Sequence, residues 1–275
     1  MGMNIFEYYG IKEVANVYFE ALGDDTKFGT GIKEGDIVLY LDTLKVSTVE
    51  TTAENVSAQG GWGNPKLVTW DYGKDINVTL EDAVVTFEEL RIMLGAKLVE
   101  ASATKPVVIH MNADFKVVKG EDEALSLVCL KEDKDGNAIV PNPKTSSVIR
   151  YLDRKNGVRG QAATIAEVLT KNTKLAANDH IMLFWEEERT GAENNGAVEL
   201  VISPDTFPGT YKVVGDALIR NEKGDDEAFQ FVINKAKMLS EVTLTMQAEG
   251  DPSTFNMTLN VLRDADGNMM SLIKY

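Results

Sequence analysis

The pattern that most constrains the fold is an alternation of apolar and polar side chains that recurs through the C-terminal part of the chain. Segments of this kind lie at residues 198–202, 211–219, 229–233, 242–246 and 255–261, with turn-forming residues between them. A period of two gives each strand one apolar face, and a series of such strands separated by turns is typical of antiparallel sandwiches and barrels. We therefore predict a mainly β protein, an antiparallel β-sandwich or barrel with flanking short α-helices.

Residues 67–95 combine a strand pattern with a helix pattern. The first half alternates as two strands do and predicts a hairpin with its turn at Gly73. The second half has apolar residues at helical spacing, and Thr86 and Glu89 have the spacing of a capping box. Gly95 is a typical residue at a helix C-terminus. The segment therefore predicts a hairpin that leads into a short helix.

The N-terminal region predicts one helix, one extended segment and one long loop. Residues 11–22 have apolar side chains at helical spacing and predict an amphipathic helix, while residues 37–48 predict extended structure. Residues 50–65 are polar and end in a glycine cluster, which predicts a long loop with a turn at its end. Trp62 lies between glycines in this turn, so it is a candidate for an exposed contact point.

The central region predicts shorter elements. Extended runs lie within residues 97–118 and at residues 125–131 and 180–188, and residues 161–171 predict a helix. Residues 141–160 predict a loop that contains one short strand, Ser147 to Leu152, because prolines, glycines and mixed charge interrupt the apolar pattern.

The net charge of the chain disfavours two classes of partner. The chain has 28 basic and 43 acidic residues, a formal net charge of −15. Binding to nucleic acid phosphates or to an anionic membrane surface needs clustered Lys and Arg, so a field of this sign disfavours both. An acidic surface does suit a wall past which a polyanion must slide without sticking.

Cysteine and histidine are too few for the common metal and nucleophile signatures. Cys129 is the only cysteine, and its flanking residues predict a buried strand position in preference to a nucleophile. His110 and His180 adjoin apolar runs and do not have the spacing of a zinc site. No phosphate-binding, dinucleotide-binding or serine-hydrolase motif is present. We therefore predict no catalytic, cofactor-binding or metal-binding residues, and a protein that is not an enzyme.

Four acidic groups are candidates for catalytic or metal-binding sites. Glu186 to Glu188 alternate faces on a strand, so a solvated face is the favoured interpretation. Glu81 with Asp82 favours a turn or helix-entry role over a catalytic pair. The DxDGN segments at 133–137 and 264–268 resemble calcium loops, but position twelve holds Lys144 or Tyr275 where an acid is needed. We interpret both segments as hairpin turns.

The N-terminal sequence and the length of the apolar runs indicate the expected cellular location of the protein. The N-terminus has no secretory signal pattern, and no apolar run is long enough to span a bilayer. We expect the protein to be made in a cytoplasm and to remain there unless it leaves as part of a larger particle.

Two stretches carry a resemblance to a known family. Asp42 to Thr86, which includes QGGWGNPKLVTWDYGKD, resembles a segment of tail-associated structural proteins of tailed bacteriophages. Phe207 to Tyr275, which begins FPGTYKVVGDALIRNEKG, resembles the C-terminal part of the same proteins. The family most similar is that of the phage tail tube, or major tail, proteins.

The resemblance implies a fold, an assembly and a set of partners. Tail tube proteins are β-sandwiches or barrels with a flanking helix that assemble as stacked hexameric rings around a DNA channel. It implies that this chain is a virion component assembled in the host cytoplasm. Its partners would be other copies of itself, other tail proteins (sheath, baseplate or terminator) and genomic DNA that passes without specific binding, with no membrane.

Length and resemblance together predict three parts. Residues 1–111 would form the N-terminal part of a tail-tube-like β domain with the hairpin-helix unit. Residues 112–195 would be an insertion or a second small α+β region, because tube subunits are often shorter. Residues 196–275 would supply antiparallel strands that complete the β domain.

Inter-subunit contacts are expected in the two long predicted loops, 50–65 and 141–160, because such loops order on assembly. The candidate contact residues lie in or beside the first of these loops: Gly60, Gly61, Trp62, Asn64, Trp70 and Tyr72.

Three alternatives remain open at this point. The first is another virion structural protein, such as a baseplate or tail-completion adaptor or a capsid decoration protein. The second is a carbohydrate-binding β-sandwich module that uses Trp62, Trp70 or Trp185 as a stacking platform. The third is a metal-dependent hydrolase that uses Glu186 to Glu188.

Overall fold

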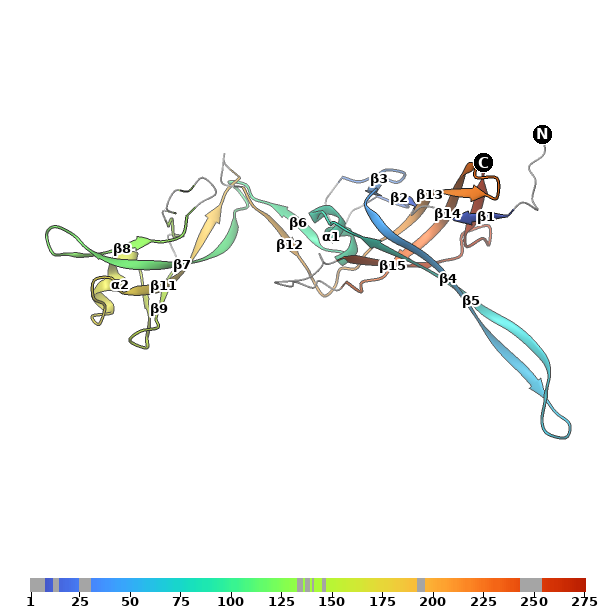
Figure 1. The fold of residues 1–275 in the computed structure, drawn as a ribbon, viewed down its shortest axis with the longest axis horizontal. Coiled ribbons are helices and arrows are strands. Elements are labelled where there is room, and N and C mark those ends of the chain that lie inside the picture. The colour runs from blue at the N-terminus through green and yellow to red at the C-terminus, as the bar shows by residue number, and fades with distance from the viewer. Residues whose placement is uncertain are drawn as a thin grey trace. The chain divides into compact units, whose positions relative to one another are not determined.

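The structure is a computed structural model that describes residues 8–11, 15–24, 31–132, 136, 139, 141–144, 147–191, 196–242 and 254–275. Antiparallel strands and two short helices make up its regular elements (Figure 1), so the predicted mainly β class is confirmed. The chain divides into two compact units. Unit 1 comprises residues 1–98 and 200–275, and unit 2 comprises residues 99–199.

Unit 1 is built on one antiparallel sheet. Its strand order is β3-β2-β13-β14-β15-β5-β4, with β1 paired to β13 and β16 paired to β14. Over the described residues this sheet is open, with β3 and β4 at its two ends. The strands are β1 (Tyr9–Ile11), β2 (Asn16–Ala21), β3 (Ile37–Leu41), β4 (Leu44–Gln59), β5 (Lys66–Asp82), β13 (Thr210–Asn221), β14 (Asp226–Met238), β15 (Phe255–Val261) and β16 (Ser271–Lys274).

The core of unit 1 covers one face of this sheet. Apolar side chains from β2, β3, β5, β13, β14 and β15 pack together with residues of helix α1 (Phe87–Leu94). Phe19, Val78, Ile233 and Leu259 are wholly or almost wholly buried there. Burial of such side chains is the main favourable term in the folding of a sheet of this kind.

The prediction of a helix over residues 11–22 is wrong. β1 and β2 occupy most of this range, and β2 pairs with β13 and β3. Val17, Phe19 and Ala21 are buried and alternate with more exposed residues. The same apolar residues fit both periods in so short a stretch, and pairing on both sides decides for the strand.

The predicted hairpin turn at Gly73 is also wrong. β5 runs without a turn from Lys66 to Asp82, and its partner is β4. Gly73 has φ 60° and, with Lys74, lies opposite the single residue Ala53. Two residues facing one, with a glycine in the left-handed region, is a β-bulge.

The long loop predicted at 50–65 is mostly strand. β4 extends to Gln59, and the connection to β5 is the short stretch of residues 60–65. The glycine-rich turn predicted at the end of this loop is confirmed: Gly60 N–H donates to Pro65 O at 3.2 Å, and Asn64 N–H donates to Gly61 O at 3.1 Å.

Helix α1 begins and ends where the sequence predicts. Thr86 Oγ1 accepts from Glu89 N at 3.1 Å, and Glu89 Oε2 accepts from Thr86 N at 2.8 Å, which completes the capping box. Gly95 ends the helix with φ 60°. A Cβ at Gly95 would lie 2.4 Å from the carbonyl carbon of Phe207, so both conformation and space require glycine there.

The segment 264–268 is a turn, but not a hairpin turn. Asp264 accepts hydrogen bonds from the N–H groups of Asp266 and Asn268 at 3.0 and 2.7 Å. The strands on either side, β15 and β16, both pair with β14 and not with each other. The segment therefore connects two strands that both pair with β14, and the prediction of a hairpin turn is wrong.

Unit 2 has its own sheet and core. The sheet has the order β10-β9-β11-β7-β8 and is antiparallel. Its elements are β7 (Val107–Lys119), β8 (Leu125–Cys129), β9 (Ile149–Asp153), β10 (Val158–Ala162), β11 (His180–Arg189) and helix α2 (Ile165–Lys171). Phe115, Ile149, Leu183 and Trp185 are buried on one face together with Val168 of α2.

The remaining strands lie at the ends of unit 2. β6 (Lys97–Glu100) pairs with β12 (Val198–Val201) as a two-stranded ladder. The chain therefore enters and leaves residues 99–199 along neighbouring strands.

Most of the other predicted strands are confirmed, with shifted bounds. The short strand predicted at Ser147 to Leu152 covers most of β9. The rest of the predicted loop 141–160 also includes the start of β10 at Val158, and the predicted helix 161–171 begins only at Ile165. The segment 133–137, apart from Gly136, and nearly all of the predicted strand 242–246 lie outside the described residues.

Candidate functional site

The most distinctive surface of unit 1 is an arm formed by residues 53–74. β15 pairs with β5 only from Asn77 to Asp82, and further out β5 has only β4 beside it. All residues of the arm are exposed or half-buried. The nine residues Lys66–Lys74, at about 3.3 Å per residue, carry the ribbon about 30 Å from the sheet, and Figure 1 shows β4 and β5 projecting together.

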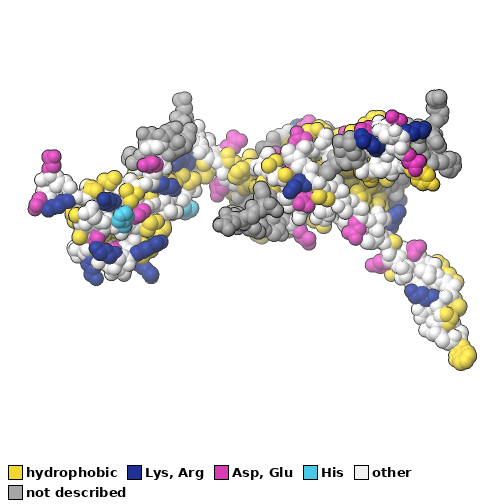
Figure 2. Space-filling view, in the orientation of Figure 1, with side chains coloured by type: hydrophobic (Ala, Val, Ile, Leu, Met, Phe, Trp, Pro, Cys, Tyr) yellow, Lys and Arg dark blue, Asp and Glu magenta, His cyan; other side chains and the backbone are white. Residues whose placement is uncertain are grey.

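The arm is amphipathic across its two faces. Register places Val56 opposite Trp70, Ala58 opposite Val68, and Glu54 opposite Tyr72. Residues opposite each other in an antiparallel ladder share a face, so one face of the arm is largely apolar and aromatic. Figure 2 shows hydrophobic side chains along the arm and at its end.

The other face of the arm is polar. Ser57 and Thr69 lie opposite each other, and their hydroxyl groups are hydrogen-bonded at 2.9 Å. Asn55 and Asp71 form the next pair on that face. In a ribbon exposed on both sides, an aromatic face on one side only indicates a surface for contact with another molecule.

The tip of the arm is an ordered turn that presents one tryptophan. Gly61, Gly63 and Asn64 have φ of 85°, 83° and 52°, conformations that glycine and asparagine adopt at low cost. Asn64 Nδ2 donates to Gln59 Oε1 at 3.0 Å and holds the turn against β4. Trp62 is fully exposed at this tip.

The structure brings the six predicted contact residues together on the arm. Trp70 and Tyr72 lie on its apolar face and are each 55% exposed, while Gly60, Gly61, Trp62 and Asn64 form the tip. Sequence reasoning missed Val56, which lies in the part of β4 predicted as loop. The alternation of Glu54, Val56 and Ala58 was the signal available for it.

The carbohydrate-binding alternative loses one of its three tryptophans. Trp185 is 2% exposed, packs edge-on against Phe115, and donates from Nε1 to Glu187 Oε1 at 2.7 Å. Its ring is a core residue of unit 2 and has no exposed face on which a sugar could stack.

The acidic run Glu186 to Glu188 alternates faces as predicted. Glu187 is buried and also accepts from Asn142 N at 3.0 Å and from Arg189 at 3.2 Å. Glu188 pairs with Lys144 at 2.9 Å. The three carboxylates therefore do not converge on one point.

The other acidic candidates have structural roles. Asp82 is buried and accepts from Thr43 Oγ1 at 2.5 Å and from Val84 N at 3.2 Å, which fits the predicted turn role. Asp264 accepts from Asn234 Nδ2 at 2.7 Å, the strongest of several hydrogen bonds that hold the pKa of that carboxyl below its ordinary value. Both carboxylates are engaged in local hydrogen bonds.

Cysteine and histidine are separated. Cys129 is buried, which confirms the core position predicted for it. His180 Nδ1 lies 2.9 Å from Asp114 Oδ2, and His110 Nδ1 lies 3.8 Å from Glu186 Oε1, both on the surface. Across the described ranges, no group of three or more His, Cys, Asp or Glu side chains is placed to hold a metal ion.

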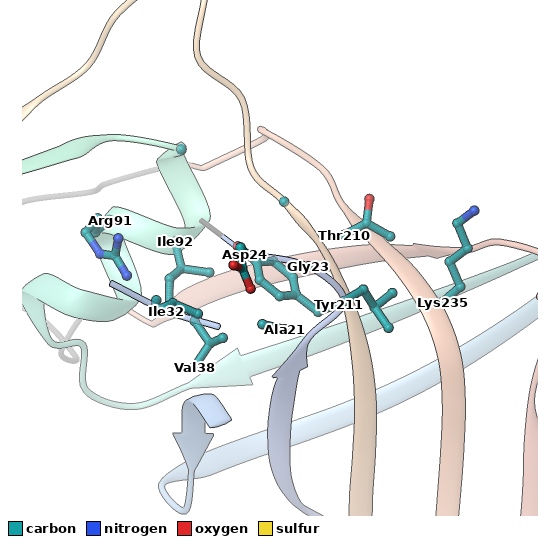
Figure 3. A pocket seen from close by; sticks show the side chains of 13 residues that line it. Ala21, Gly23, Asp24, Ile32, Val38, Arg91, Ile92, Thr210, Tyr211 and Lys235 are labelled. Carbon is teal, nitrogen blue, oxygen red and sulfur yellow. The ribbon is translucent and has the colours of Figure 1, made fainter. Parts of the chain in front are cut away.

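Unit 1 also contains a pocket of about 440 Å³ beside β2, α1 and β13. Figure 3 shows Arg91 and Ile92 on one side of it and Thr210 and Lys235 on the other. Arg91 is paired with Glu88, with Nε 2.9 Å from Oε2. Asp24 accepts from Glu34 N at 3.0 Å and from Lys33 at 3.2 Å, and these bonds lower its pKa. Arg91 and Asp24, two of the three charged residues that line the pocket, are thus already partnered.

Neither helix in the described residues is long and apolar enough to cross a membrane.

Over the described residues, unit 1 is thus an open antiparallel sheet with a projecting amphipathic arm. A family model for the YomU/Tube protein family matches residues 9–273. The chain therefore belongs to the YomU/Tube protein family, which agrees with the resemblance to phage tail tube proteins. No curated protein matches the chain significantly.

Proposed function

We propose that the protein is the subunit of a phage tail tube and that its copies form stacked hexameric rings. Family membership supports a tail tube structural protein in general. The proposal of stacked hexameric rings rests on the arm, because its apolar face has no partner among the described residues of the chain.

The energetics of the arm favour a second copy as its partner. A two-stranded ribbon without a core behind it is marginal in water. Burying about 100 Å² of each ring of Trp70 and Tyr72 would contribute about 2.5 kcal/mol apiece. The arm therefore becomes most stable when its apolar face is covered on assembly.

The open sheet gives a second reason for ring formation. β3 and β4 end the sheet and leave strand edges that can pair with other chains. A closed ring satisfies such edges and limits the number of copies, whereas an open series of contacts leads to fibres. Each ring in this proposal pairs these edges between neighbours.

The DNA channel is the part of the proposal that rests on charge. The net charge of −15 suits a lumen through which genomic DNA passes without specific binding. Other tail proteins, such as sheath, baseplate or terminator, would contact the ends or the outside of the tube. A neutral or basic lumen in a reconstruction of the assembled ring would contradict this part.

The division of the chain into residues 1–111, 112–195 and 196–275 stays a prediction. We propose that unit 2, residues 99–199, is an addition to the tube-forming part.

The test is electron microscopy of the purified protein at high concentration, with two matched variants. Trp70→Glu places a charge on the apolar face of the arm, and Thr69→Glu places the same charge on its polar face one residue away. We expect tubes or stacked rings from the parent and from Thr69→Glu, and none from Trp70→Glu.

Both variants should retain the parent's circular dichroism and melting temperature, because both positions are exposed. Equal assembly of the two variants would show that the apolar face of the arm is not the contact. Discrete monomers or trimers of the parent would instead favour the baseplate, adaptor or decoration alternatives.

A further inference from the structure

One face of the unit 2 sheet is open in the described residues, opposite its core. On the core side lie Tyr151, Leu183 and their neighbours, so the residues between them point the other way. Register then places Phe184 beside Arg150, and Leu152 between Arg159 and Met182. We call this set the arginine face: Arg150, Leu152, Arg154, Arg159, Met182 and Phe184.

The arginine face has an apolar centre and a guanidinium rim. Leu152 and Met182 are half-buried, and Phe184 is 37% exposed. Two shallow hollows of about 470 and 480 Å³ meet at Leu152, one reaching Arg150 and Arg159 and the other reaching Arg154. Figure 2 shows Lys and Arg side chains around this end of unit 2, where β9 lies in Figure 1.

The three arginines have no carboxylate partner among the described residues. All three are exposed, and no ion pair or side-chain hydrogen bond joins them to a described group. They are three of the seven arginines of the chain, gathered on two neighbouring strands and the turn between them. A guanidinium is a planar donor suited to carboxylates, so an unpaired set of three indicates an acidic partner.

The composition of the face favours a protein over a nucleic acid. Asp114 and Glu186 lie on the same side of the sheet as Met182 and Phe184, so the face also carries carboxylates beside its guanidinium groups. Apolar and aromatic side chains at the centre with arginine around them are typical of protein interfaces. Unit 2 also has 16 acidic and 13 basic residues, so it is not a basic domain overall.

We propose that the arginine face binds the acidic surface of a second copy of this chain. Charge identifies the occupant: residues 1–98 with 200–275 carry 27 acidic and 15 basic residues, and an assembly brings this acidic part of other copies close at high local concentration. The inference rests on the proposed self-assembly and adds a contact to it that is separate from the arm.

The size of the face sets the strength of this contact. Three strands about 4.8 Å apart and five residues about 3.3 Å apart cover roughly 240 Å². A stable interface buries about 800 Å² per partner, so one such contact does not hold two copies together in dilute solution. It acts when other contacts already align the copies, as in multivalent binding.

The test is photo-cross-linking of the full chain with p-benzoylphenylalanine in place of Phe184. Equal amounts of ¹⁵N-labelled and unlabelled protein are mixed, assembled and irradiated, so that mass spectrometry distinguishes links between copies from links within one. We expect mixed-isotope links from position 184 to residues 1–98 or 200–275 of another copy. The same analogue at Val128, an exposed position on β8, is the control and should give at least tenfold fewer such links.

Charge reversal then tests the arginines. Arg150→Glu with Arg159→Glu in the photoreactive chain should reduce the links at least tenfold. Lys105→Glu with Lys119→Glu makes the same change of charge elsewhere on exposed residues of unit 2 and should leave them unchanged. Salt at 0.5 M should also reduce the links, because exposed charges are screened.

The outcomes separate this inference from the proposed function. Links between copies without tubes would support the arginine face and contradict the tube. Tubes without links from position 184, or links only within one copy or to nucleic acid, would overturn the inference and leave the tube proposal intact. Links that survive the double reversal of Arg150 and Arg159 would also overturn it.

Discussion

The arm and the arginine face are both exposed β surfaces, yet they differ in what lies behind them. The arm is a ribbon exposed on both sides, and Trp70 on its apolar face has no core residue beneath it. The arginine face is the outer side of a sheet whose inner side holds wholly buried Ile149 and Leu183. The first surface depends on the ladder alone, while the second is supported by packing.

This difference shows at which positions a substitution could change assembly without changing the stability of the fold. A charge on a side chain without a core behind it changes the free energy of unfolding little, because water solvates it in both states. A charge placed into the core changes that free energy greatly, because the folded state must exclude the water. Substitutions along β5 and within each core can break or sharpen this comparison.

The largest effect is expected from Val78→Asp. Val78 is wholly buried in the supported part of β5, so a carboxylate there should cost about 5 kcal/mol or more and unfold unit 1. Urea denaturation with hydrogen exchange would measure it, with loss of protection in β5, β13 and β15. A soluble, normally assembling Val78→Asp protein would mean that the faces of β5 are assigned the wrong way round.

Gly95→Ala should have the next largest effect. The left-handed conformation costs a non-glycine residue about 1 kcal/mol, and the new Cβ would meet the backbone of Phe207 at 2.4 Å. Together these should lower the free energy of unfolding by about 2–4 kcal/mol. Gly61→Ala, also at positive φ but in open space, is the control and should cost only the conformational part.

Asp153→Asn tests unit 2 by itself. Asp153 is wholly buried and accepts from Asn156 N at 3.0 Å and from the Nδ2 groups of Asn156 and Asn172, each at 2.9 Å. An amide in its place would set donors against donors and should cost about 1.5–3 kcal/mol by thermal or urea unfolding. Asp122→Asn, on an exposed turn, should leave unfolding unchanged.

The same carboxylate predicts a dependence on pH. Burial opposes ionisation of Asp153, but the hydrogen bonds from Asn156 and Asn172 outweigh it and hold the pKa below its ordinary value of 3.8. A lowered folded-state pKa stabilises the protein fully above 3.8, and this stabilisation is lost as the pH falls through the folded value. Asp153→Asn should therefore show a smaller loss of stability below pH 3.8 than the parent, and an equal loss would contradict this role.

The smallest effect on stability is expected from Val68→Asp. The change is the same as at Val78, in the same strand, but Val68 is 48% exposed on the arm. Its free energy of unfolding should stay within about 0.5 kcal/mol of the parent value. A loss comparable to that of Val78→Asp would mean that the arm folds back onto a core.

Elements that are determined by their own residues could be predicted from the sequence. The capping box of α1 needs only Thr86, Glu89 and Gly95, and all three act as expected. β11 is also predicted correctly, because one of its faces is buried and the alternation is therefore strong.

Elements that depend on pairing with another strand were not predicted from the sequence. The outer part of β4 has no buried residue, so no strong apolar alternation marks it, and only its pairing with β5 makes it a strand. Gly73 looked like a turn because a left-handed glycine serves both turns and bulges. The choice between them depends on where the partner strand lies.

Of the two candidate surfaces, the aromatic residues of the arm could be predicted from the sequence and the arginine face could not. Trp62, Trp70 and Tyr72 could be proposed from sequence because large aromatic residues lay close together among glycines and polar residues. The arginine face could not, because Arg150, Arg159 and Phe184 come together only through the register of three strands.

The bulge at Gly73 has a consequence for the direction of the arm. It lies between Tyr72, the last ladder position of the free ribbon, and Asp75, where the ladder resumes toward the sheet. A bulge bends its strand and increases the local twist, so the backbone at Gly73 and Lys74 sets the angle at which the aromatic face leaves the subunit. In the proposed assembly, the conformation of these two residues would therefore set the angle at which the arm of one copy meets another copy.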